Sequence, residues 1–136
     1  MNSMIARKKS ISLIFRGFDL AVQDVEVLVG APASRFGNAG EFVRPNVKPR
    51  MTRSFIGFTL VFQSNYELCE MLPALFNHLG GVDHLCEIRD KVLPEHFQIE
   101  FDLPAKESED MQDGHLPIDV IADVLKLRTT LGFSFF

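Results

Sequence analysis

Residues 35–53 gather positive charge in a segment that is interrupted by glycine and proline. The segment reads RFGNAGEFVRPNVKPRMTR and contains one acidic residue, Glu41, and five cations: Arg35, Arg44, Lys48, Arg50 and Arg53. The planar guanidinium group of arginine can bind a carboxylate or a phosphate through two parallel hydrogen bonds. The glycines and prolines of residues 35–53 argue against a regular helix or a regular strand, so we predict a long loop. Loops of this length are often functional. Two interpretations stay open, a hydrated surface connector and a site for an anionic ligand or partner.

Negative charge gathers in a later part of the chain. Residues 95–123 contain nine acidic residues and one lysine. Four of these acids lie in a polar, loop-like stretch: Glu107, Glu109, Asp110 and Asp113. Such an excess can steer a basic partner, and it can equally serve solubility. We therefore take these four acids, together with the arginines at positions 35, 44, 50 and 53, as the candidate partner-binding residues.

Histidine and cysteine occur close together in HLGGVDHLC, which contains His78, His84 and Cys86. Zinc prefers nitrogen and sulfur ligands, but a structural site needs four of them, and the chain has no C-x-x-C or H-x-x-x-H pair. Cys69 and Cys86 both have apolar neighbours, unlike the exposed thiolate of a catalytic cysteine. We predict two reduced, partly buried cysteines, with no metal, no cofactor and no catalytic residue.

Other patterns that could support chemistry have simpler interpretations. Asp119 and Asp123 are four residues apart, a spacing that could hold a cation or serve acid–base catalysis, but that also fits the solvent-exposed face of an amphipathic helix. The glycines of GNAGE lack the lysine of a phosphate-binding loop, and no G-x-S-x-G elbow occurs. The sequence therefore predicts a protein that is not an enzyme.

The length and composition indicate one ordinary globular domain. The chain has 136 residues and a formal net charge of −4, and a mildly acidic balance argues against general nucleic-acid binding. No stretch approaches the ~20 apolar residues of a membrane span. Arg7, Lys8 and Lys9 precede an apolar run over 11–15 that is too short for a signal peptide. We predict a flexible segment over 1–9, a single domain over 10–136 and a cytoplasmic location.

Hydrophobic periodicity predicts four strands, over 10–17, 54–63, 96–103 and 131–136. In the third of them, Phe97, Ile99 and Phe101 face the core while Gln98, Glu100 and Asp102 face water. Three longer helices are predicted over 20–30, 64–79 and 116–127, with a short helix after Asp83.

The ends and faces of these helices can also be predicted. Asp19, Asp83 and the Ser64/Glu67 pair are candidate N-terminal caps, and Pro73 predicts a kink or a break near Cys69. Spacing predicts that the last helix buries one stripe of apolar side chains: Ile118, Ile121, Ala122 and Leu125.

The order β-α-β-α-β-α-β with one extra helix predicts an α+β fold. We expect a two-layer sandwich in which helices cover one face of a four-stranded, mostly antiparallel sheet, related to the ferredoxin-like fold. The order of the strands in the sheet stays open.

Four stretches, which cover most of residues 10–136, carry a resemblance: FDLAVQDVEVLVGAPASRF, FGNAGEFVRP, YELCEMLPALFNHL and HLPIDVIADVLKLRTTLGFSFF. Together they resemble a family of small bacterial proteins known as domain of unknown function forty-two seventy-nine. Because that family has no agreed activity, the resemblance implies a fold more than a function. Small acidic bacterial proteins of this type are also similar to immunity proteins, which block a toxin encoded beside them.

Two functions of different classes follow. The first is a protein-binding module, specifically an immunity-type inhibitor that occludes the active site of a cognate bacterial toxin through its acidic and basic regions. The second is a sensor or accessory domain that binds a small anion between Arg35, Arg50 and Arg53. The expected partner is another protein, and neither nucleic acid nor membrane is expected.

Overall fold

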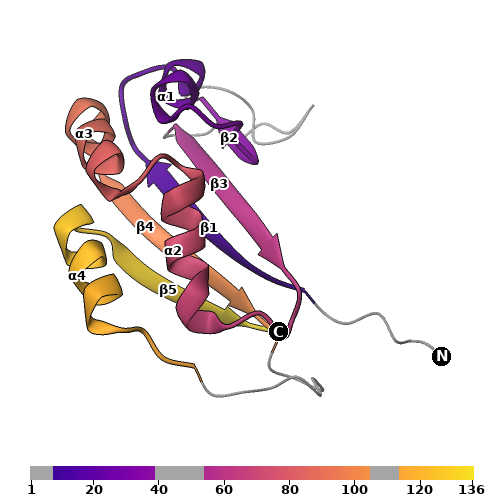
Figure 1. Ribbon diagram of the computed structural model, residues 1–136. Coiled ribbons are helices and arrows are strands. Elements are labelled where there is room, and N and C mark those ends of the chain that lie inside the picture. The colour runs from indigo at the N-terminus through magenta and orange to yellow at the C-terminus, as the bar shows by residue number, and fades with distance from the viewer. Residues whose placement is uncertain (1–7, 39–53, 105–113) are drawn as a thin grey trace, which may run out of the picture.

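The computed structural model describes residues 8–38, 54–104 and 114–136. Within them the chain forms one mixed β-sheet and four helices (Figure 1). The strands are β1 (Lys9–Arg16), β2 (Arg35–Gly37), β3 (Phe55–Phe62), β4 (His96–Leu103) and β5 (Thr130–Phe135). The helices are α1 (Val22–Val29), α2 (Leu68–His78), α3 (Val82–Val92) and α4 (Ile118–Leu127).

The sheet has the strand order β2-β3-β1-β4-β5, so the first strand in the chain is the central one. β1 pairs antiparallel with both β3 and β4, and β2 pairs antiparallel with β3. β5 pairs parallel with β4, and α4 provides the connection that a parallel pair needs. Among the described residues, β5 therefore forms one edge of the sheet and β2 the other.

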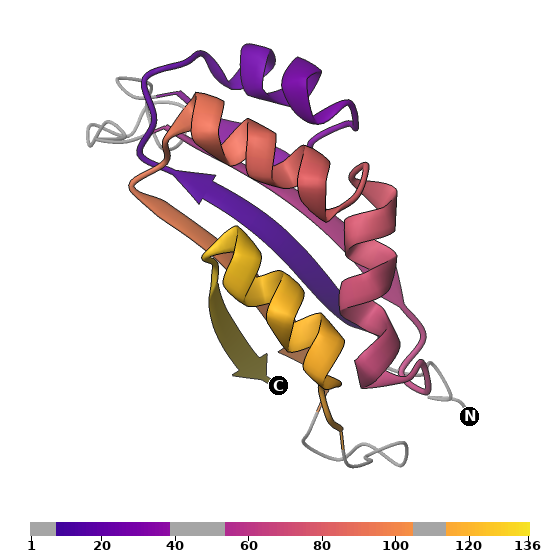
Figure 2. The same ribbon diagram turned by 60° about the vertical axis from the view of Figure 1, so that its left-hand side comes forward.

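All four helices lie on the same face of the sheet, which makes two layers (Figure 2). Alternate residues of each strand point toward them, as a period of two requires. In the register of the three central strands, Leu13 lies opposite Phe58 on β3 and Ile99 on β4, and all three side chains are buried in the core. Helix residues such as Leu72 and Leu85 close this core from the other side.

The predicted fold class is confirmed, while parts of its detail are wrong. The fold is α+β, most strand pairings are antiparallel, and the helices pack on the sheet. The sheet has five strands, however, so it is not the four-stranded sheet of a ferredoxin-like fold. The additional strand is β2, which begins the basic segment that was predicted to lack regular structure. The short helix predicted after Asp83 is α3, which has 11 residues and equals α2 in length.

The predicted buried stripe of the last helix is also wrong. α4 buries Val120, Val124 and Leu127 against the core. The predicted residues point away from the core, and Ile118 is 85% exposed and Leu125 76% exposed. Apolar residues occur on both sides of this helix, so their spacing alone did not identify the side that packs on the sheet.

Helix ends differ from the predictions as well. Ala21, Glu67 and Gly81 occupy the N-cap positions of α1, α2 and α3, and none of them caps through its side chain. α2 begins four residues after Ser64, and it continues from Leu68 to His78 with Pro73 inside it, so the predicted break does not occur. Pro73 is the sixth residue of α2, and because it lacks a backbone N–H it removes at most one hydrogen bond within the helix.

Candidate functional site

Within the described residues, no helix covers the second face of the sheet, which we call the open face. Its side chains come from alternate residues of the strands, and β1 contributes four of them: Ser10, Ser12, Ile14 and Arg16. Neighbouring strands place Thr59, Gln98, Glu100 and Asp102 beside them. The open face is therefore mostly polar, as the predicted water-facing side of residues 96–103 requires.

One end of the open face carries positive charge. Arg16 lies over the ring of Phe55, with 5.7 Å between its guanidinium carbon and the ring centroid. Arg35 on β2 is paired with Gly57, and a Cβ at position 57 would lie 3.4 Å from the Arg35 side chain and 3.7 Å from Ile14. The missing Gly57 side chain thus leaves room for the stem of Arg35, which helps to explain why Ile14 is only 1% exposed.

The opposite end of the open face carries negative charge. Asp102 accepts a hydrogen bond from Ser10 Oγ at 3.4 Å, and Glu100 Oε1 accepts one from Gln98 Nε2 at 2.6 Å. Gly132 on β5 lies opposite Glu100, and a Cβ there would lie 3.6 Å from Glu100 Cγ. Arg35 is level with Ile14 of β1, and Asp102 is level with Ser10 of β1. These two positions of β1 are four residues apart, or about 13 Å along the strand. The two charges are thus separated along one surface.

A buried pair of hydroxyl groups lies between these ends. Ser12 Oγ and Thr59 Oγ1 are 2.7 Å apart and share a hydrogen bond across β1 and β3. Ser12 is only 3% exposed although it lies on the open face. The centre of this face is therefore closely packed at the Ser12–Thr59 pair.

Most of the predicted partner-binding residues lie outside the described residues: Arg44, Arg50, Arg53, Glu107, Glu109, Asp110 and Asp113. Arg35 is the described member of the set, and it is exposed at the basic end of the open face. The acidic stretch follows Leu103, which is the last residue of β4 and the residue after Asp102. The two predicted regions thus join the described fold at opposite ends of the same face.

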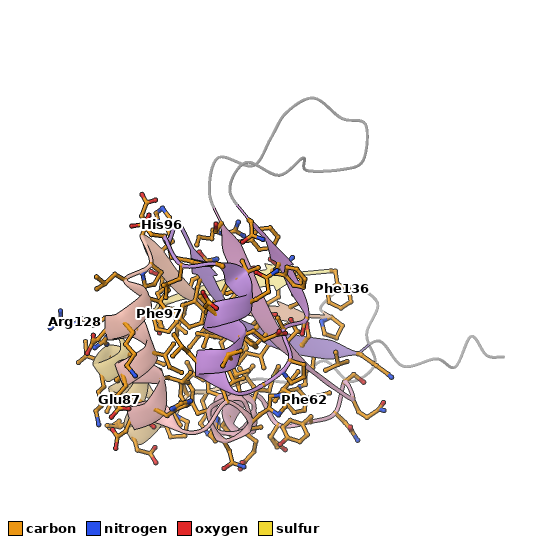
Figure 3. The ribbon with its side chains drawn as sticks, turned by 90° about the horizontal axis from the view of Figure 1, so that it is seen from above. Phe62, Glu87, His96, Phe97, Arg128 and Phe136 are labelled. Atoms are coloured by element: carbon orange, nitrogen blue, oxygen red, sulfur yellow. The ribbon has the colours of Figure 1, made fainter. Side chains whose placement is uncertain are left out.

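A cavity of about 360 Å³ opens where β4 and β5 begin, and Gln98 of the open face is one of its lining residues. Its lining comes from the end of α3, the start of β4 and the turn before β5: Arg89, Pro94, Glu95, His96, Phe97, Gln98, Arg128 and Thr130. Figure 3 shows His96 and Arg128 on the same side of the molecule, far from Phe136. Arg35 does not line this cavity, so the predicted anion site and the observed cavity are different places.

Two of the cavity residues are held by local contacts. Arg89 donates a hydrogen bond from Nη1 to the carbonyl oxygen of Lys126 at 2.9 Å and forms an ion pair with Asp90, also at 2.9 Å. Arg128 ends α4 in the left-handed region, with φ of 57°. A non-glycine residue adopts this conformation at a cost, so it persists only where the surrounding structure determines it. This backbone conformation sets the direction in which the Arg128 side chain leaves the turn.

The histidine and cysteine residues have structural surroundings in this fold. His84 Nε2 lies 3.0 Å from the carbonyl oxygen of Val29, and Cys86 donates a long hydrogen bond of 3.8 Å to the carbonyl of Lys126. Both cysteines are unpaired and partly buried. Across residues 8–38, 54–104 and 114–136, no group of three or more His, Cys, Asp or Glu side chains could hold a metal ion.

Lys126 on α4 has the one resolved change in ionisation among the described groups. Its ammonium group pairs with Asp83 on α3, and this contact raises the pKa of Lys126 above its ordinary value of 10.5. The pair therefore links α3 and α4 on their exposed sides. In the part of the chain that the structure describes, none of the helices has the length and apolar composition that crossing a bilayer requires.

Sequence reasoning did not select Glu100, Asp102, Arg89 or Arg128 as site residues. The first two were predicted to face water, and their alternation with Phe101 was the available signal. Arg89 and Arg128 come from separate helices, and no sequence pattern indicated that they would line one cavity. In comparisons with known proteins, no family model, no curated protein and no solved structure matches this chain.

Proposed function

We propose that this protein is a non-enzymatic protein-binding module, specifically an immunity-type inhibitor that neutralises a cognate bacterial toxin in the cytoplasm by occluding its active site. The observation that carries the proposal is the open face of the sheet, with Arg16 and Arg35 at one end and Glu100 and Asp102 at the other. A surface with separated charges suits recognition of a complementary protein surface.

The acidic end is the better candidate for contact with a toxin. Enzymes that degrade nucleic acid present a basic surface to their substrate, so an acidic inhibitor is steered toward that surface by its field. Glu100 and Asp102 lie on β4, whose end leads into the stretch that holds Glu107, Glu109, Asp110 and Asp113. We propose that these acids form one contact region and that the arginines of residues 35–53 contact the partner at the other end.

A charge-reversal experiment tests this proposal on the product of the neighbouring gene. The double variant Glu100→Lys, Asp102→Lys should slow association with that protein on the order of tenfold and weaken its dependence on salt, because steering is lost. The matched control is Glu87→Lys, which reverses an exposed charge on α3, in the helix layer. Association kinetics by surface plasmon resonance provide the measurement. Equal rates for all three proteins, or no binding by the native chain, would reject the proposal.

The cavity at the start of β4 and β5 favours a second candidate function, the binding of a small anion. Arg89, Arg128 and His96 bring two guanidinium groups and an imidazole to a space of about 360 Å³, within the usual range for ligand pockets. Glu95 also lines this space and Asp90 pairs with Arg89, so part of the positive charge is already balanced. We therefore rank this function second.

Thermal unfolding in the presence of phosphate and nucleotides separates the two candidates. An anion that binds the native chain should raise its melting temperature, and Arg128→Gly should abolish that rise. Glycine adopts the left-handed conformation of position 128 readily, so this variant removes the guanidinium group without straining the turn. Lys91→Ala, which removes an exposed cation from the last turn of α3, is the control. No shift with any anion would dismiss this function.

A further inference from the structure

We propose that two copies of this chain associate through β5 and α4, which extends the sheet across a two-fold axis into ten strands. The surface consists of five exposed apolar side chains, and we call it the α4–β5 surface: Ile118, Ile121, Leu125, Phe133 and Phe135. It lies at the side of the sheet opposite β2 and away from the centre of the open face.

The α4 part of this surface lies on the side of the helix that faces away from α3. Lys126 pairs with Asp83 of α3, and its carbonyl oxygen accepts a hydrogen bond from Arg89 of α3. An α-helix turns by 100° per residue, so Ile121 and Leu125 each lie more than a quarter of a turn around α4 from Lys126. The buried residues of α4 separate the Lys126 side of the helix from the Ile121 and Leu125 side. The exposed apolar stripe of α4 therefore borders the edge of the sheet at which β5 lies.

The backbone of β5 is available for pairing along its outer edge. Among the described residues no strand pairs with that edge. The amide of Phe136 donates to the carbonyl of Leu103 on β4, at 3.0 Å, so the even-numbered residues from 130 to 136 direct their backbone groups toward β4. By alternation, the amide and carbonyl groups of Leu131, Phe133 and Phe135 point outward.

β5 also lacks the features that keep edge strands apart. Its sequence, TLGFSF, has no charged residue and no proline, which are the usual protections against pairing between edges. Its helix-facing side chains include Phe133 and Phe135, which remain 46% and 62% exposed. Phe133 stacks on Phe101 of β4 with 4.9 Å between the ring centroids, so its ring is already held in the orientation that a partner would meet.

A second copy is the occupant that fits this surface. The outward groups of Leu131, Phe133 and Phe135 pair with themselves in an antiparallel arrangement, with Phe133 opposite Phe133 and Leu131 opposite Phe135 of the second copy. This register places the apolar side chains together on the helix-facing side, beneath the two α4 stripes. None of the five side chains of the α4–β5 surface is charged, so two copies can meet there without placing like charges of this surface against each other.

The exposed area is close to what such a dimer needs. The five side chains together expose roughly 600 Å², which approaches the ~800 Å² that each partner contributes to a standard interface. The backbone of β5 and Leu131 would add to this area. The open face stays accessible in the dimer, so this proposal and the proposed function can hold or fail independently.

Sedimentation of the full chain tests the association. The native protein should sediment at twice the monomer mass of 15.4 kDa and dissociate on dilution. Phe133→Glu and Leu125→Glu should each give monomers because they place a charge in the contact. Val27→Glu is the control, because Val27 is 78% exposed on α1 and its substitution should leave the dimer intact. A native chain that stays monomeric at every concentration, or a dimer that survives both variants, would overturn the proposal.

Two further measurements test the register without charged substitutions. In a Cys69→Ser, Cys86→Ser background, Phe133→Cys should cross-link two copies on oxidation, whereas Phe135→Cys, which faces Leu131, should not. In the native protein, the amides of residues 131, 133 and 135 should resist hydrogen exchange when concentrated and lose that protection on dilution. Equal cross-linking of both variants, or exchange that does not depend on concentration, would overturn the register.

Discussion

Two serines on the open face, Ser12 and Ser10, form hydrogen bonds that differ in length and in burial, and we expect them to contribute differently to stability. Ser12 is almost completely buried and shares a hydrogen bond of 2.7 Å with Thr59, whereas Ser10 reaches Asp102 at 3.4 Å. A buried hydroxyl group needs a partner because water cannot reach it, and a more exposed one does not.

We expect Ser12→Ala to lower the free energy of unfolding by about 1 kcal/mol, because Thr59 loses its partner in a closely packed place. Ser10→Ala should have a smaller effect, since its hydrogen bond is long and more accessible to water. Urea denaturation of both variants and the native chain measures the difference. An equal decrease in the free energy of unfolding for the two variants would contradict the expectation that burial makes the Ser12 hydrogen bond the more important one.

The ion pair between Lys126 and Asp83 gives a prediction about pH. A lysine whose pKa is raised in the folded state gains stability that is present below its unfolded pKa and lost as the pH rises through its folded pKa. This contribution should therefore be intact below pH 10.5 and decline as the pH rises beyond 10.5 through the raised pKa. Asp83→Asn should return the pKa of Lys126 toward 10.5, and an NMR titration of the Lys126 side chain measures the change. An unchanged pKa in this variant would rule out Asp83 as the cause.

At the level of elements, α4 shows why periodicity identified a helix but not its buried side. Its sequence, IDVIADVLKL, has apolar residues on two sides, and both spacings fit a helix. The side that packs on the sheet is set by the neighbouring α3 and β4, which lie far away in the sequence. β2 was missed for a similar reason, because three residues are too few for a period of two to be recognised.

Two leucines on α4 allow a matched test of its orientation. Leu127 is completely buried and Leu125 is 76% exposed, although they are only two residues apart. Leu127→Ala should lower the free energy of unfolding by about 2–5 kcal/mol because it leaves a cavity in the core. Leu125→Ala should change it by less than about 0.5 kcal/mol, when measured at a dilution at which the chain is monomeric. The reverse ranking would mean that the helix is rotated.

At the level of the whole molecule, the sequence predicted the layers better than the arrangement of strands. Alternation in residues 10–17 and 96–103 was enough to locate β1 and β4 and the side chains that they bury. The parallel pairing of β4 with β5 could not be predicted, because period-two alternation is the same in either direction. The cavity could not be predicted either, since Arg89, His96 and Arg128 meet only after three elements have packed.

The central position of β1 predicts that shortened chains do not fold. Leu13 needs both Phe58 on β3 and Ile99 on β4 to be buried on the sheet. A chain that ends at residue 94 lacks β4 and β5, so we expect it to be digested rapidly by a protease while the full chain resists. Comparable resistance of the two chains would contradict the dependence of the core on β4.

This position of β1 also has a consequence during synthesis on the ribosome. β1 is translated before β3 and β4, so its apolar residues Ile11, Leu13 and Phe15 are synthesised before the two strands that pair with them. Pairings between such distant residues form slowly, and an unpaired apolar strand is prone to aggregation in the meantime. We therefore expect a nascent chain of this protein to bind chaperones that recognise short apolar segments.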